Sequence, residues 1–334
     1  MKKMPQEQVR STQTVIRARF ESILDTVEVQ DLVNYIARDH HIRIIEVDPD
    51  LTNRIAMVMF GGREAHVLRV FGESLDFWQG YQASSETASR ARCRARISPL
   101  SLARLGAVYN RALKVLPGPI RAGFQIRRAG GLPEPPAQPL PGTPGKMDLK
   151  ILVSPFPVLF AIVLATEDLP SVETLLAAFT SFQGEVSQDI NPMALYSLRR
   201  EYQSVYQKLS RLSTLIDDVS LTRHIRVVCR IDDYRRLPLA TVYSELNEIF
   251  RPFALRVAGC QILGYLPLEA LLSSLKVLYP GDAPIHRAPL GTKLDILLKR
   301  LHLSEVEPFA MSRQILDFLL QPELVQEIYA SGAN

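Results

Sequence analysis

Residues 257–272 read VAGCQILGYLPLEALL, and this stretch decides how the second half of the chain folds. The apolar run up to Ile262 predicts a strand, and Pro267 suits the first turn of a helix, where its missing N–H costs nothing. Gly259 and Gly264 flank one apolar step at the end of the strand. Glycine is needed where the backbone takes a positive φ or closely approaches a ligand. The stretch therefore predicts a strand, a glycine turn and a helix beside a candidate ligand site.

Length and composition indicate an ordinary folded protein. The chain has 334 residues, of which 47% are hydrophobic, and this predicts two domains with cores of their own. Its three cysteines lack the spacing of a zinc motif or a disulfide framework, so we expect a cytoplasmic protein without a metal site. The polar start MKKMPQEQVR argues against a signal peptide. The most apolar window, 151–165, is too short to span a bilayer, so no membrane association is expected.

Basic residues are concentrated in one segment of the chain. The net charge is only +4, yet residues 90–130 hold nine arginines and one lysine and no acidic residue. Such a concentration creates a local positive field that attracts polyanions. A solvated surface that favours arginine is the alternative interpretation. The residues through which nucleic acid would bind are Arg90, Arg92, Arg94 and Arg96.

Strands and helices alternate along both halves of the chain. In the first half, strands are predicted at 14–20, 42–47, 55–60, 92–97 and 120–126, and helices at 29–38, 63–78 and 99–115. In the second half, strands are predicted at 151–165, 213–219, 225–231 and 257–262, and helices at 171–182, 192–209, 239–250, 268–272, 290–301 and 311–328. This order predicts an α/β fold, in the form of an α+β sandwich. Each subdomain is expected to be a mixed β-sheet with helices packed on one face.

A proline- and glycine-rich stretch separates the two series. It reads GGLPEPPAQPLPGTPG and offers few backbone donors and few apolar side chains, so it predicts a semi-extended linker. We therefore expect an N-terminal subdomain at 13–129, a linker at 130–147 and a C-terminal subdomain at 148–330.

Several segments resemble the glutamate formiminotransferase (formimidoyltransferase) family, whose members move a formimino group from formiminoglutamate to tetrahydrofolate. Between Arg226 and Leu320, RVVCRIDDYRRLPLATVYSELNEI, GCQILGYLPLEALL and KRLHLSEVEPFAMSRQILDFL resemble the family's C-terminal subdomain, and EVDPDLTNRIAMVMFGG resembles its Thr-Asn-Arg signature. The resemblance implies a formiminotransferase-like fold in both subdomains, tetrahydrofolate as ligand or co-substrate, and a homodimer. The ligand-binding residues that it implies are Asn53, Arg54, Gly259, Gln261 and Gly264.

The residues that carry the chemistry of that family are replaced in this sequence. With Pro99 as the anchor, the family's general-base histidine falls at Ser89. A serine hydroxyl does not titrate near neutrality and cannot take over as a proton acceptor. The family's two strand asparagines appear as Val163 and Ala165, and its folate-side polar run appears as 228–230. The resemblance therefore implies a degenerate catalytic motif.

Three functions are compatible with these residues. The first is a catalytically inactive binding or scaffold protein of folate-dependent one-carbon and histidine-degradation ancestry, which binds a folate or a small anionic ligand. The second is an active tetrahydrofolate-dependent formimidoyltransferase with a relocated base, for which His66 is the candidate. The third is a polyanion- or nucleic-acid-binding protein that uses the basic 90–130 segment. The first is favoured because the base and the polar ligand contacts are lost together.

Overall fold

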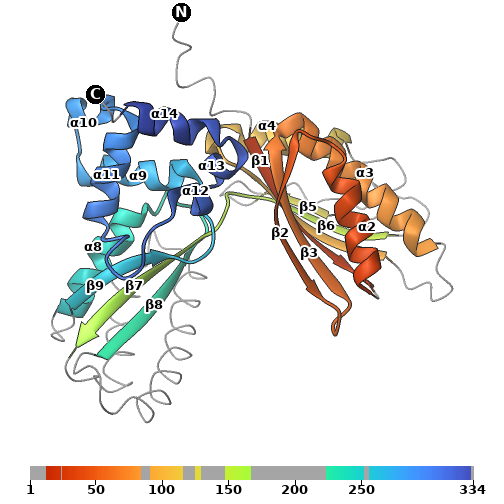
Figure 1. Ribbon diagram of the computed structural model, residues 1–334, viewed down its shortest axis with the longest axis horizontal. Helices are drawn as coiled ribbons and strands as arrows, with labels where there is room; N and C mark the ends of the chain where they lie inside the picture. Colours follow the sequence, from red (N-terminus) through yellow and green to blue (C-terminus); the bar gives the residue numbers. More distant parts are fainter. Residues whose placement is uncertain are drawn as a thin grey trace, which may run out of the picture. The chain divides into compact units, whose positions relative to one another are not determined.

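The structure is a computed structural model that describes residues 13–23, 25–83, 91–115, 125–128, 147–166, 223–251 and 256–331 (Figure 1). Contacts between Cα atoms divide the chain into two compact units, Met1–Pro155 and Phe156–Asn334. We expected the second subdomain to begin at residue 148. The division lies later because the strand Met147–Val153 pairs with the sheet of the first unit. Within the described residues, no helix is long and apolar enough to cross a bilayer.

The first unit is built on a six-stranded mixed sheet in the order β2-β3-β1-β4-β6-β5. The pairs β2–β3, β3–β1 and β1–β4 are antiparallel, whereas β6 runs parallel to both β4 and β5. The strands predicted at 14–20, 42–47, 55–60 and 92–97 are confirmed, and the one predicted at 120–126 is described only from residue 125. The bounds are β1 Gln13–Glu21, β2 Ile42–Asp50, β3 Ile55–Arg63, β4 Ala91–Pro99, β5 Gln125–Arg128 and β6 Met147–Val153.

Three helices cover one face of this sheet: α2 (Thr26–Ala37), α3 (Glu64–Ala83) and α4 (Leu105–Val115), the last preceded by the short 3-10 helix η1 (Leu102–Arg104) (Figure 1). Alternation along the strands decides which side chains lie under them. Ile16 and Cys93 are fully buried in the core, whereas the residue that follows each of them, Arg17 or Arg94, is exposed. Trp78 of α3 is also fully buried.

The second unit contains a three-stranded antiparallel sheet in the order β8-β7-β9, with helices packed beside it (Figure 1). The strands are β7 Val158–Thr166, β8 Arg223–Ile231 and β9 Arg256–Ile262. The helices are α8 Leu239–Phe250, α9 Leu268–Leu278, α10 Ala283–Arg287, α11 Leu290–Arg300, α12 Met311–Gln314, α13 Leu316–Leu320 and α14 Glu323–Ser331. The predictions at 225–231, 239–250 and 290–301 are confirmed. Those at 171–182, 192–209 and 213–219 lie outside the described residues.

Two sequence predictions in the second half were wrong in detail. The single strand region at 151–165 is two strands, β6 and β7, that belong to different sheets. Pro155 and Pro157 lie between them, and proline cannot donate to a ladder. The single helix at 311–328 is three short helices. It is interrupted because Leu266 forms a parallel bridge with Ile315, with hydrogen bonds from Leu266 N to Gln314 O and from Leu316 N to Leu266 O.

Both units therefore combine a β-sheet with packed helices. This arrangement confirms the predicted α/β fold of the α+β kind.

Candidate functional site

The stretch at 257–272 folds as strand β9, a turn and helix α9, as the sequence predicted. Gly264 in the turn has a φ of +87°, a conformation that side chains with a β-carbon avoid. Pro267 lies at the N-cap, one position before the predicted place, and Leu268 begins the helix. The N–H of Leu268 donates to Oδ2 of Asp317, at 2.7 Å. A carboxylate of α13 therefore accepts a hydrogen bond from the first backbone N–H of α9.

Gly259 is required by packing against its own chain. A β-carbon at Gly259 would lie 2.6 Å from Cγ2 of Val306 and 3.2 Å from Cβ of Glu305. The next residue, Cys260, donates its N–H to the carbonyl oxygen of His302, at 2.8 Å. The segment that follows α11 thus lies against the free edge of β9, and glycine permits this approach.

Gln261 is a buried polar residue of β9. Its side chain is 5% exposed, and neither Oε1 nor Nε2 has a hydrogen-bond partner in the described part of the chain. A buried amide without partners costs about 1–3 kcal/mol, so this position is a candidate ligand contact. The neighbouring residues of β7 are apolar and buried: Ala161, opposite Gln261, is 0% exposed, and Val163, opposite Gly259, is 4% exposed.

The positions of the family's folate-side run, 228–230, are also altered. Cys229 is buried, and burial raises the pKa of its thiol far above the ordinary range, so it stays protonated. The Arg230 side chain is half-buried and its Nε donates to Oδ1 of Asp232, at 3.0 Å. Cys229 is therefore a core residue, and Arg230 pairs with a carboxylate two residues further along the chain.

Asn53 and Arg54 lie in the tight turn between β2 and β3. The backbone N–H and the side-chain amide of Asn53 donate to the two carboxylate oxygens of Asp50, at 3.1 and 2.7 Å. These hydrogen bonds hold the pKa of Asp50 below its ordinary value. Arg54 has a φ of +56°, and its carbonyl accepts from the N–H of Ile23, at 3.1 Å. The Asn53 amide thus has a turn-forming role in the structure.

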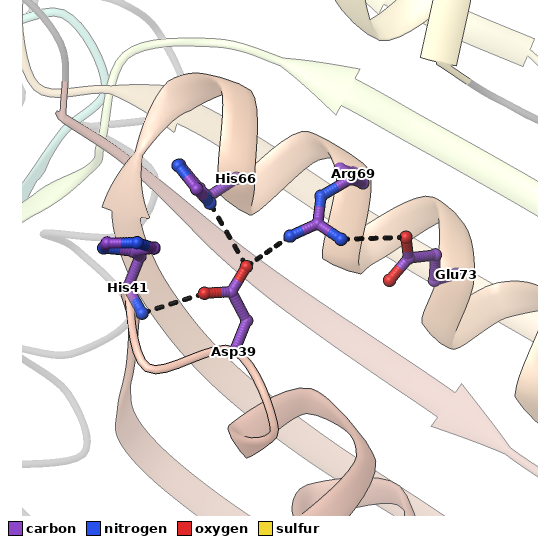
Figure 2. Close-up of polar contacts among 5 residues, drawn as sticks. All are labelled: Asp39, His41, His66, Arg69 and Glu73. Carbon is purple, nitrogen blue, oxygen red and sulfur yellow. Dashed lines mark hydrogen bonds and ion pairs between the residues drawn. The ribbon is translucent and has the colours of Figure 1, made fainter.

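A cluster of polar residues joins the turn between α2 and β2 to the first turn of α3 (Figure 2). Asp39 Oδ1 accepts the backbone N–H of His41, at 2.9 Å, and Asp39 Oδ2 lies 3.2 Å from Nδ1 of His66. The same Oδ2 accepts from Arg69, whose other terminal nitrogen bonds Glu73 at 3.2 Å. We call Asp39, His41 and His66 the histidine–aspartate cluster, because one donor atom from each lies within 4.8 Å of the others.

Hydrogen bonds and desolvation fix the charges in the histidine–aspartate cluster. The N–H of His41 holds the pKa of Asp39 below its ordinary value and outweighs the opposing effect of burial, with His66 and Arg69 adding to it. Desolvation lowers the pKa of His41, and the nearby His40 and His66 add to this effect. At neutral pH the cluster thus presents a carboxylate and, at His41, a neutral imidazole.

His66 and the Asn53–Arg54 turn lie at opposite ends of β3. Arg54 immediately precedes this nine-residue strand and His66 lies just beyond its other end, a separation of about 27 Å along an extended strand. The register of β1 with its two neighbours places Arg92 of β4 at the Asn53 end. Ser89, the position of the family's base, lies outside the described residues.

On the face of the first sheet opposite the helices, the neighbouring strands β1 and β4 carry a group of arginines. Arg17 of β1 is opposite Arg96 of β4, Arg19 is opposite Arg94, and Arg94 is also opposite Lys150 of β6. Acidic residues share this face: Glu21 forms ion pairs with Arg19 at 3.4 Å and Arg94 at 3.8 Å, and the register also places Glu46 and Asp48 of β2 and Asp148 of β6 on it. We call the set of basic residues the basic sheet face. Its members are Arg17, Arg19, Arg92, Arg94, Arg96 and Lys150.

Two other arginines of the basic 90–130 segment, Arg104 and Arg111, lie on the helices and pair with Glu64 of α3. Arg111 donates to Glu64 at 2.9 Å, and Arg104 lies 3.8 Å from the same carboxylate, which is almost fully buried. The described arginines of this segment therefore include some on the basic sheet face and two that pair with the buried Glu64 carboxylate.

These features define a two-unit α/β protein. Comparisons with known proteins show which family part of the chain resembles. Residues 201–321 match the family described as the formiminotransferase domain. The formimidoyltransferase-cyclodeaminase of Dictyostelium discoideum is 28% identical over 116 residues, which make up 35% of this chain and 21% of that protein. The resemblance to the formiminotransferase family is therefore confirmed for this part of the chain, which spans about a fifth of the length of the Dictyostelium relative.

A solved structure described as that of a candidate glycine cleavage system transcriptional repressor is also similar. It has 9% sequence identity and covers 75% of this chain and 98% of its own, with a TM-score of 0.24. This score is too low to support an argument about fold or function.

Sequence reasoning missed the histidine–aspartate cluster and the arginines of β1. Asp39 and His66 are 27 residues apart, and no regular spacing links them. The alternation of Arg17 and Arg19 with apolar residues was a usable signal, because it is the same pattern that drew attention to Arg92, Arg94 and Arg96.

Proposed function

We propose that this protein is a formiminotransferase-like binding protein that does not transfer a formimino group. Its ligand in this proposal is a reduced folate or a related small anion. The observation that carries the proposal is the burial of Val163, 4% exposed, at a position where the formiminotransferase family has an asparagine. An apolar side chain packed in this way offers no amide to orient a substrate.

The internal contacts of the expected ligand residues support the same proposal. Val306 accounts for the absence of a side chain at Gly259, and Asp50 engages the amide of Asn53. Gln261 differs from them because its buried amide has no internal partner among the described residues. We therefore assign Gln261 as the residue that contacts the ligand.

The arrangement of the first unit argues against an active transferase with His66 as its base. A base must lie within about 3 Å of the proton that it removes. His66 lies about 27 Å from the Asn53–Arg54 turn along β3, and its Nδ1 is engaged with Asp39. The motion needed to bring it to that turn would break the helix start at Glu64.

Two measurements on the full chain test this proposal. The purified protein, mixed with formiminoglutamate and tetrahydrofolate, is expected to show no turnover, and sustained turnover would overturn the proposal. Calorimetry with tetrahydrofolate is expected to show binding that weakens in Gln261→Met. Because the variant removes an unbonded buried amide, it is also expected to be at least as stable as the parent protein. A homodimer, expected from the family resemblance, is part of the proposal, and light scattering measures it.

The basic sheet face favours a second candidate function, the binding of a nucleic acid through its phosphates. Like charges directly opposite each other on a sheet are destabilising, yet Arg17 faces Arg96 and Arg19 faces Arg94. Alternate residues on a strand are about 6.6 Å apart, so Arg92, Arg94 and Arg96 form a regular row of charges. Such a row suits a chain of phosphates.

The expected mode of nucleic-acid binding is insensitive to sequence, because phosphate contacts carry no base information. Affinity for a single-stranded oligonucleotide is expected to fall steeply with salt concentration, with a slope that decreases by about one for each phosphate contact removed. Arg94→Ala and Arg96→Ala are expected to reduce the slope, whereas Arg287→Ala, an exposed arginine of the second unit, is the control. A gel shift that is absent, or that does not respond to salt, would remove this candidate.

A further inference from the structure

The histidine–aspartate cluster brings together, from two separate segments, three side chains of the types that bind metal ions (Figure 2). Asp39 and His41 belong to the turn between α2 and β2, and His66 belongs to the first turn of α3. The sequence indicated no metal site, because these residues do not follow a metal-ligand spacing. The fold itself creates the juxtaposition.

Close packing of the backbone holds the two segments in place. Gly62 precedes α3 and pairs with Ile42 of β2, and a β-carbon on Gly62 would collide with the carbonyl oxygen of His41. In addition, Asp39 accepts the N–H of His41, and its carbonyl accepts the N–H of Ile42 at 2.9 Å. The ligand atoms therefore start from backbones that are fixed relative to each other, which is what a metal site requires.

One of the three donor–donor distances already matches that of a coordinated ion. In a tetrahedral zinc site, bonds of about 2.0–2.1 Å place neighbouring donor atoms about 3.3 Å apart. Asp39 Oδ2 and His66 Nδ1 lie 3.2 Å apart, so this edge of a tetrahedron has its final length. The His41 and His66 rings have centroids 4.4 Å apart, and all three donors lie within 4.8 Å. A rotation of the exposed His41 side chain that shortens its distances by about 1.5 Å completes the set.

We propose that Asp39, His41 and His66 bind a divalent transition-metal ion of the zinc class. Two imidazoles and a carboxylate form a ligand set that suits Zn²⁺, Co²⁺, Ni²⁺ and Cu²⁺, whereas Mg²⁺ and Ca²⁺ require oxygen ligands. Three protein ligands leave one tetrahedral position for solvent. None of these three residues belongs to the folate or nucleic-acid sites proposed above.

Arg69 competes with the metal ion for Asp39. Its guanidinium donates to the Asp39 carboxylate, and a bound cation must displace it. Glu73, one helical turn further along α3, already accepts from the other terminal nitrogen of Arg69, at 3.2 Å. The Arg69 side chain is 53% exposed, so after displacement it retains both an acidic partner and solvent. This competition gives the proposal a test in which a variant gains affinity.

The experiment is a calorimetric titration of the full chain with zinc chloride after treatment with a chelator. We expect one Zn²⁺ site whose affinity falls by more than about tenfold in His41→Ala and in His66→Ala. Arg69→Gln is expected to bind Zn²⁺ several times more tightly than the parent. His286→Ala is the matched control, because this histidine of α10 bonds the carbonyl of Tyr279 and lies outside the histidine–aspartate cluster. Magnesium chloride is expected not to compete.

Spectroscopy and folding measurements complete the test. Co²⁺ bound to the parent protein is expected to give the visible absorption of a tetrahedral site, and His41→Ala is expected to lose it. Circular dichroism establishes that each variant is folded; if His66→Ala is not, the exposed His41 decides the result. Zinc binding that is absent at high micromolar concentration, or that is unchanged in both His41→Ala and Arg69→Gln, would overturn the proposal. Tetrahydrofolate binding is expected to be the same in His41→Ala, so this result and that of the proposed function are separable.

Discussion

Gly259 of β9 and Val306 pack so closely that a β-carbon on the glycine would lie 2.6 Å from the Val306 Cγ2 atom. The hydrogen bond from Cys260 N to His302 O holds the two segments at this separation. Gly259 and Gly264 are therefore required for different structural reasons. Gly259 makes room for a neighbouring segment, and Gly264 takes a positive φ with open space around it.

Gly259→Ala is expected to lower the free energy of unfolding by about 1–3 kcal/mol, because the added carbon overpacks the contact with Val306. Gly264→Ala is expected to cost about 1 kcal/mol through its backbone conformation alone. Gly80→Ala is the control: it lies within α3 with nothing near its β-carbon position, so it is expected to stabilise by about 0.5–1 kcal/mol. Urea unfolding measures all three, and a Gly259→Ala protein as stable as the parent would refute the packing argument.

Asp317 is expected to stabilise the start of α9 across a long sequence distance. Its Oδ2 accepts the N–H of Leu268 at 2.7 Å, and its side chain is 7% exposed. Asp317→Ala leaves this buried N–H without its acceptor and is expected to cost about 1–3 kcal/mol. Asp317→Asn retains an acceptor oxygen and is expected to cost less. Thermal unfolding measures both, and equal losses in the two variants would contradict the role of the acceptor.

Local periodicity explains which parts of the fold the sequence predicted well. The helix at 239–250 and the strands at 55–60 and 92–97 have apolar spacings that need no distant partner. The division of 151–165 into β6 and β7 depends on which sheet each part joins, and that choice is made by β4 for one strand and by β8 and β9 for the other. Pro155 and Pro157 mark the break locally, but no local pattern encodes which sheet each strand joins.

The candidate site was predictable in part for the same reason. The glycines of 257–272 marked a special backbone, but only the structure shows that Val306 is the partner of Gly259. The arginines of β4 were visible as an alternating run, whereas their pairing with Arg17 and Arg19 follows from the register of two strands that are far apart in the chain. Pairing across long loops determines such sites.

His41 is expected to make the stability of the protein sensitive to acid. Desolvation holds its pKa below the ordinary value of 6.5; His40, His66 and Arg63 add to this effect and Asp39 opposes it. The unfolded chain therefore takes up a proton first as pH falls below about 6.5, and the free energy of unfolding decreases until the folded His41 is itself protonated.

Urea unfolding of the parent and of His41→Gln, at about pH 7.5 and about pH 5.5, tests this linkage. The parent is expected to lose more stability than the variant on acidification. The comparison within each protein is the control for other titrating groups, including Asp39, whose depressed pKa acts only at lower pH. A parent and variant with the same loss would show that His41 does not contribute.

Arg17 and Arg96 provide a test that separates stability from binding on the basic sheet face. Arg17→Glu places a carboxylate directly opposite Arg96, so a repulsive cross-strand pair becomes attractive, and the protein is expected to gain about 0.2–1 kcal/mol. The same change is expected to weaken oligonucleotide binding and reduce its salt dependence, because a phosphate contact is lost. Arg287→Glu makes the same change in net charge on α10 of the second unit and is the control. Thermal unfolding and a salt-dependent binding titration measure the two effects, and equal weakening of binding by both variants would assign the effect to net charge and not to the basic sheet face.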